Sequence, residues 1–147
     1  MLDPRIEEYI EKHTSPEEDL LYALRRKTFL HTPYPRMLSG PVQGRFLEMI
    51  SRMIRPSRIL EVGTFTGYSA ICLAQGLAPD GILHTIEAEG AYAEIASEYF
   101  HKTGLEDKIT LHQGDALMVI PQLNEIFDLV FLDAAKENYI DYYNLVF

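Results

Sequence analysis

Residues 58–69 constrain the fold of this chain more than any other segment. They read Arg-Ile-Leu-Glu-Val-Gly-Thr-Phe-Thr-Gly-Tyr-Ser, an apolar strand that runs directly into a turn with two glycines. Gly63 and Gly67 permit positive φ angles and a close approach of the backbone to a ligand. Glu61, just before the turn, would repel a phosphate held by backbone amides. We therefore expect a ligand with a positive centre or many hydroxyls, and an ordinary strand–turn–helix connection is the simpler alternative.

Two familiar nucleotide-binding patterns are missing from this segment. Glu61 stands where the first glycine of G-x-G-x-x-G would be, and no G-x-x-x-x-G-K-[ST] is present. S-adenosylmethionine has both a sulfonium and a ribose, so it fits the pattern better than a dinucleotide or a nucleoside triphosphate.

Apolar runs and helical patterns alternate after this segment. Strands are predicted over residues 59–62, 82–86, 109–112 and 128–132, and helices over residues 68–77, 91–103 and from about 136. This alternation indicates an α/β protein with a doubly wound parallel sheet and helices on both faces. Four strands are fewer than such sheets usually have, so we expect a fragment whose C-terminal strands are missing.

Two further helices are predicted upstream of the first strand. Ser-Pro-Glu-Glu at 15–18 has the form of a capping box and predicts a helix that runs to about Phe29. The second helix begins near Pro41 and ends before Pro56. Its expected apolar face consists of Phe46, Leu47, Ile50, Met53 and Ile54.

Acidic residues stand where ligands bind in such sheets, at the carboxyl ends of the strands. Glu87 follows the second strand and suits a ribose diol, or it is a solvated loop residue. Asp115, beside Ala116, suits an adenine amine, or it caps a short helix. Asp133 follows the fourth strand and suits Mg²⁺, or it caps the last helix.

Composition restricts the classes of function. The chain has 147 residues, 47% of them hydrophobic and 24% charged, which is typical of one globular domain. With 22 acidic and 13 basic side chains its formal charge is −9, which disfavours broad binding to nucleic acid or to an anionic membrane. Cys72 is the only cysteine and reads as an inert buried thiol. No apolar run approaches the roughly 18 residues of a membrane span, so we expect a cytoplasmic protein.

The order of these motifs resembles the metal-dependent O-methyltransferases of the catechol and caffeoyl-CoA type. The resemblance rests on residues 60–70, Glu87, Gly-Asp-Ala at 114–116, and Phe-Leu-Asp-Ala-Ala-Lys-Glu-Asn-Tyr at 131–139. It implies a Rossmann-like fold, with a helical cap over residues 1–36 and an S-adenosylmethionine-binding core over residues 37–147. It also implies methyl transfer from that cofactor to a hydroxyl of a small aromatic diol, with Mg²⁺ as the expected metal.

The resemblance also implies a role for each matching position. The cofactor would be bound by Met37, Ser39, Glu61, Gly63, Thr64, Phe65, Ser69, Glu87, Asp115 and Ala116, with Tyr68 in the adjoining wall. Asp133 would ligate the metal and border the cofactor, and Lys136 would be the general base. A solvated first-turn lysine is the alternative for Lys136.

The chain departs from the family pattern in two places. The family's further metal ligands, an Asp-Asn pair, do not occur within these residues, and Ala134 and Ala135 replace bulky residues and so widen the acceptor pocket. The resemblance also allows a hydroxylated tRNA base as an alternative acceptor, since some relatives in the family modify one. The missing Asp-Asn pair favours a non-catalytic cofactor-binding module as an alternative function. In the expected strand order 3-2-1-4 the fourth strand is an exposed edge, which predicts a homodimer.

Overall fold

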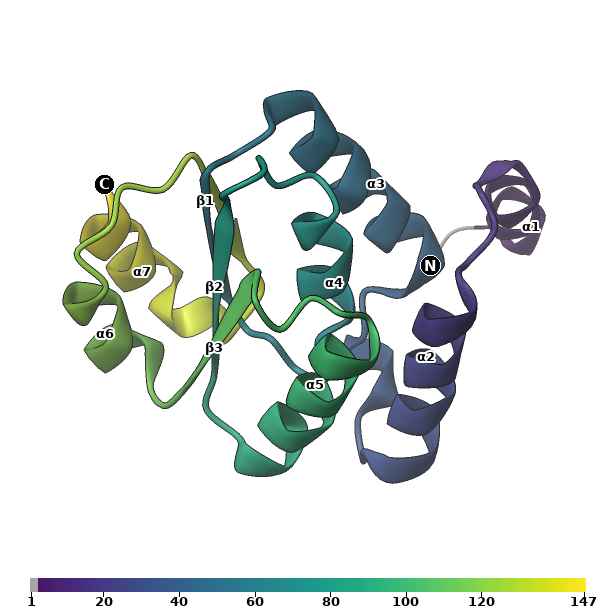
Figure 1. Cartoon of the computed structure of the whole chain (residues 1–147). Coiled ribbons are helices and arrows are strands. Elements are labelled where there is room, and N and C mark those ends of the chain that lie inside the picture. The colour runs from purple at the N-terminus through teal and green to yellow at the C-terminus, as the bar shows by residue number, and fades with distance from the viewer. Residues whose placement is uncertain (1–2) are drawn as a thin grey trace.

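The protein is built around a parallel sheet of four strands, and the computed structural model describes residues 3–147 (Figure 1). The strands are β1 (Arg58–Val62), β2 (Ile82–Glu87), β3 (Ile109–Gln113) and β4 (Leu129–Leu132). They follow the order β3-β2-β1-β4, and all three pairs are parallel. The four predicted strands and their order are confirmed. β1, which carries Glu61, lies inside the sheet between β2 and β4.

Helices cover both faces of the sheet, as the alternating pattern predicted (Figure 1). One face packs against α3 (Gly40–Ile54), α4 (Tyr68–Ala74) and α5 (Gly90–Lys102), and the other against α6 (Ala116–Val119) and α7 (Tyr139–Val146). Side chains alternate along each strand, so Ile59 faces the first layer while Leu60 faces the second. Each layer therefore has its own apolar core.

The N-terminal segment contains two helices, α1 (Pro4–His13) and α2 (Asp19–His31). The sequence indicated no helix at α1, and it predicted a start for α2 that is too early. Glu18 is the N-cap of α2 and makes no capping bond with its side chain. The capping box, in which the Glu18 side chain would bond back to Ser15, did not form, and the Glu18 carboxylate instead accepts a hydrogen bond from Arg45 at 3.4 Å. The neighbouring Glu17 contacts Arg25 within α2 and Tyr68 at the start of α4.

The apolar face predicted for α3 is wrong in part. Phe46, Met53 and Ile54 are exposed, and the buried residues of α3 are Gly44, Leu47 and Ser51. Two of these three residues, Gly44 and Ser51, are small, and α4 packs closely against the first: a Cβ on Gly44 would lie 2.7 Å from Cε1 of Tyr68. Close packing of two helices therefore decided which face is buried.

Three short 3-10 helices complete the described structure, and they consist of Pro35–Met37, Ile120–Gln122 and Lys136–Asn138. Within residues 3–147 no helix has the length and apolar character needed to cross a membrane.

Candidate functional site

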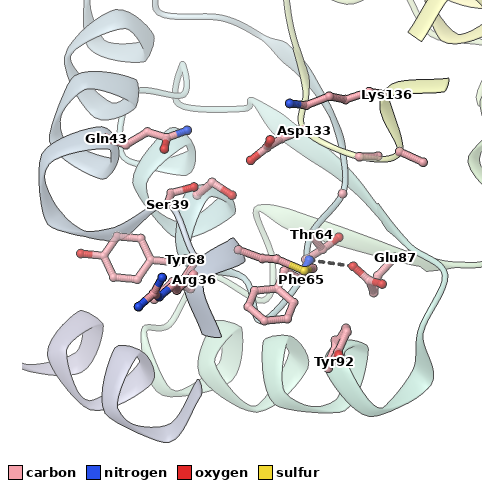
Figure 2. Close-up of a pocket in the computed structure, with 16 residues that line it drawn as sticks. Arg36, Ser39, Gln43, Thr64, Phe65, Tyr68, Glu87, Tyr92, Asp133 and Lys136 are labelled. Atoms are coloured by element: carbon pink, nitrogen blue, oxygen red, sulfur yellow. Dashed lines mark hydrogen bonds between the residues drawn. The ribbon is translucent and has the colours of Figure 1, made fainter. Parts of the chain in front are cut away.

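A cavity of about 660 Å³ opens at the carboxyl ends of β1, β2 and β4. Its wall contains Ala134 and Ala135 and ten of the residues that the resemblance assigned to the cofactor, the metal or the base, and Figure 2 shows several of them around one space. These ten are Met37, Ser39, Gly63, Thr64, Phe65, Tyr68, Ser69, Glu87, Asp133 and Lys136. The strands of a parallel sheet end at one rim, so residues distant in sequence meet there.

Glu61 has no exposed surface and is not one of the residues that line this cavity, although Gly63 and Ser69 of the same segment are. Its Oε2 accepts a hydrogen bond from the Thr85 hydroxyl, whereas its Oε1 is buried without any partner among residues 3–147. Burial raises the pKa of Glu61 to about 7, against the opposing influence of the Ser69 and Thr85 hydroxyls. A buried carboxylate oxygen without a donor is unusual, because buried polar atoms are nearly always paired. The arrangement suits a ligand that brings a donor or a cation.

The two glycines of the turn serve the packing of the chain. Gly63 has φ +99°, and a Cβ there would lie 2.3 Å from the backbone oxygen of Asp133. Gly67 has φ +95°, and a Cβ there would lie 2.8 Å from the ring of Phe100. Both positions therefore require glycine before any ligand is considered. The close approach at Gly63 brings Asp133 to the edge of the cavity.

Glu87 is a structured part of the cavity wall, and the solvated-loop alternative is wrong. It is 9% exposed, and its two oxygens accept backbone hydrogen bonds from Phe65 (2.7 Å) and Glu89 (2.9 Å). Burial raises its pKa, and these amides oppose the shift. Phe65 adopts φ +50°, and its ring meets Tyr92 edge-on with centroids 4.7 Å apart. The carboxylate and the aromatic pair are thus held together.

Asp133 and Lys136 lie on the opposite side of the cavity from Glu87 (Figure 2). Asp133 caps no helix, since Ala135 and Asn138 are the N-caps of the two final helices, so the capping alternative is wrong. Partial burial raises the pKa of Asp133, and Lys136 acts against this rise. No group of three or more His, Cys, Asp or Glu side chains suited to a metal occurs within the described part of the chain.

Asp115 and Ala116 do not line the cavity. Asp115 is exposed and accepts a hydrogen bond from the Leu117 amide at 2.9 Å, which confirms it as the N-cap of α6. Ala116 is buried in the second core. Their proposed contact with an adenine remains a prediction.

Four residues of the cavity wall were missed in the sequence: Arg36, Leu38, Gln43 and Tyr92. Gln43 stands one helical turn beyond Ser39, and Tyr92 lies in the first turn of the helix after Glu87. Helical spacing from the predicted residues could therefore have indicated both. Nothing in the local pattern marks Arg36 or Leu38.

The sheet order, the acidic residues at successive strand ends and the orphaned Glu61 oxygen define a class. The chain is a Rossmann-like α/β protein with a ligand cavity at its strand ends.

Comparison with known proteins names the family. The model of the O-methyltransferase family matches residues 11–147. A catechol O-methyltransferase of Niastella koreensis is 32% identical over 142 residues, which cover 94% of this chain and 64% of that protein. Caffeoyl-CoA O-methyltransferase 1 of Eucalyptus globulus is 33% identical, with 86% of this chain and 53% of that protein covered. The SAH-bound methyltransferase of Podospora anserina has a TM-score of 0.91 at 30% identity and covers 97% of this chain and 62% of that one.

The chain therefore belongs to the O-methyltransferase family. It spans between about half and two thirds of the length of these relatives.

Proposed function

We propose that the protein transfers a methyl group from S-adenosylmethionine to a hydroxyl of a small aromatic diol. The observation that supports it best is the unpaired Oε1 of Glu61, a buried carboxylate oxygen in the segment whose residues Gly63 and Ser69 line the cavity. This oxygen can accept a hydrogen bond or pair with a positive charge. Names among the relatives, catechol and caffeoyl-CoA O-methyltransferase, favour an aromatic acceptor. S-adenosylmethionine supplies an electrophilic methyl group on a sulfonium.

Residues in and after two neighbouring strands would bind different parts of the cofactor. Glu61 would attract the positively charged part of the cofactor, and Ser69 and Thr64 would add hydroxyls around its amino-acid portion. Glu87 already uses one lone pair of each oxygen on a backbone amide, and the remaining lone pairs can accept from a ribose diol. Phe65 and Tyr68 would exclude water from the space between them.

Lys136 is proposed to accept the proton of the reacting hydroxyl at Nζ in its neutral form. It borders the cavity beside Asp133, on the side away from Glu87 (Figure 2). This placement separates an acceptor region near Lys136 from a nucleoside region near Glu87. Ala134 and Ala135 leave the acceptor region wide.

Asp133 is further proposed to give one ligand to Mg²⁺. Mg²⁺ often keeps several waters and takes one or two carboxylates, so one aspartate is compatible with binding but makes a weak site alone. A bound Mg²⁺ would lower the pKa of the acceptor hydroxyl. Cytoplasmic location and a homodimer remain predictions.

Binding and turnover test the proposal separately. Calorimetry with S-adenosylhomocysteine should give a measurable Kd, and Glu87→Gln should weaken it by about 10- to 100-fold, as expected for loss of hydrogen bonds to a charged group. Glu89→Gln, on the exposed neighbour, is the control and should change the Kd little. No binding by the unaltered chain would refute the proposal.

Methyl transfer from labelled S-adenosylmethionine to caffeate or dihydroxybenzoate, with Mg²⁺ or with EDTA, tests the chemistry. We expect transfer that needs Mg²⁺ and is lost in Lys136→Met. Binding without transfer under any condition would support the non-catalytic module instead.

A further inference from the structure

Helix α2 and the segment before it contact the glycine turn and the start of α4 through buried polar side chains. The hydroxyls of Thr28 on α2 and Thr66 in the turn are 2.8 Å apart, and neither residue has exposed surface. Two residues after Thr66, the hydroxyl of Tyr68 donates to Oε1 of Glu17 over 2.8 Å. Glu17 belongs to the segment between α1 and α2. The cavity wall is therefore attached to a part of the chain 51 residues away.

Glu17 is fixed by further bonds. The Arg25 guanidinium donates to both of its oxygens, with Nη2 at 2.8 Å from Oε2 and Nε at 3.0 Å from Oε1. The Glu17 side chain is only 10% exposed. Two-pronged pairs of this kind hold the direction of a carboxylate as well as its place. Pro16, the preceding residue, also accepts a hydrogen bond from Arg45 on α3.

Tyr68 has little freedom to leave this partner. It is 2% exposed, and one ring edge lies against Gly44, where no Cβ could fit. Figure 2 shows its hydroxyl directed away from Asp133 and Glu87, so that the phenol ring borders the cavity while the oxygen reaches outward. The ring is therefore held at one end by packing and at the other by Glu17.

We propose that Glu17 is a positioning residue for the cofactor, which acts by holding the Tyr68 ring in the cavity wall. This inference rests on the proposed function, because it assumes that the cavity binds the cofactor. On this proposal, residues 14–31 hold part of the cofactor site in place, in addition to any role as a cap over the acceptor. Cofactor affinity then depends on a contact that does not touch the cofactor.

A double-mutant cycle tests the inference. The Kd of S-adenosylhomocysteine is measured by calorimetry for Glu17→Gln, Tyr68→Phe and the double variant, at a temperature where circular dichroism shows all of them folded. Each single change should weaken binding by about tenfold, because Tyr68→Phe removes the hydroxyl donor and Glu17→Gln removes the negative charge and the two-pronged Arg25 pair that hold the acceptor in place. The double variant should be no weaker than Tyr68→Phe, because without the hydroxyl the position of Glu17 no longer affects the ring. Glu98→Gln is the matched control. It removes the ion pair of Glu98 with Lys27, which also ties α2 to the core but is remote from the cavity wall.

Three outcomes are distinct. Loss of affinity in the Glu17 and Tyr68 variants with unchanged affinity in the Glu98 variant supports the inference. Unchanged affinity in Glu17→Gln, or equal loss in all three single variants, overturns it and leaves only a general role in stability. Absence of binding in the unaltered chain refutes the proposed function itself.

Discussion

Glu61 is buried with one carboxylate oxygen hydrogen-bonded and the other without a partner in the described structure. Its folded-state pKa of about 7 lies above the 4.5 of an ordinary glutamate, so the folded protein holds this proton more tightly than the unfolded chain does. Stability contributed by this group is present below pH 4.5 and is lost as the pH rises to about 7. The loss is on the order of 3 kcal/mol for a shift of this size.

Glu61→Gln should remove that pH dependence in the ligand-free protein. As the pH is raised from 5 to 8, we expect the free energy of unfolding of the variant to rise relative to that of the unaltered chain, by up to about 3 kcal/mol. Urea unfolding at the two pH values measures the difference. Glu94→Gln, at an exposed position of α5, should show no such gain. An equal difference at both pH values would contradict the burial argument. The same Glu61 variant should bind S-adenosylhomocysteine more weakly, since it lacks the negative charge.

Helix α3 packs against helix α4 through a glycine, Gly44. Gly44→Ala would place a methyl group 2.7 Å from the Tyr68 ring and 2.8 Å from Sγ of Cys72. Alanine favours a helix by about 1 kcal/mol over glycine, but overpacking costs about 1 to 3 kcal/mol, so a net loss of stability is expected.

Urea unfolding measures that loss, with Gly104→Ala as the comparison. Gly104 has φ +66° and open space around it, so its variant reports backbone strain without a steric clash. A Gly44→Ala protein more stable than the original would contradict this prediction, because it would show that the two helices can move apart without a loss of stability.

The elements differ in how far the sequence could predict them. The strands and their order follow from apolar runs bounded by turns, because a buried parallel strand needs apolar side chains on both faces. The start of α2 and the buried face of α3 could not be predicted from local rules. Glu17 is drawn into a tertiary contact with Tyr68, and Gly44 is buried because a ring from α4 lies on it. Glu61 was identified from the sequence, but its hydrogen bonding could not be, because the donor to its Oε2 is Thr85 on the neighbouring strand and its Oε1 has no donor in the described structure.

Three strongly exposed apolar side chains lie on one side of the whole molecule. Ile126, Ile140 and Phe147 are 90%, 75% and 81% exposed on the side of β4 and α7, and β4 pairs only with β1 among the described strands. Exposed strand edges with apolar surroundings favour association. We expect the chain to form a dimer with the side that carries α7.

Ile140→Lys should then reduce the average mass measured by sedimentation over a range of concentrations. Met53→Lys, an equally exposed change on α3, should leave the mass as it was. A mass of 16.8 kDa at every concentration would show that the chain is monomeric.

The central position of β1 determines how long the candidate site persists once the chain has folded. Glu61 is hydrogen-bonded into a strand with neighbours on both sides, so its amide can meet solvent only when the sheet itself comes apart. The amides of β1 should accordingly exchange their hydrogens as slowly as any in the described chain, while α1, which buries no side chain, exchanges almost at once. Helices at the periphery would thus open and close many times while the central strand stays hydrogen-bonded.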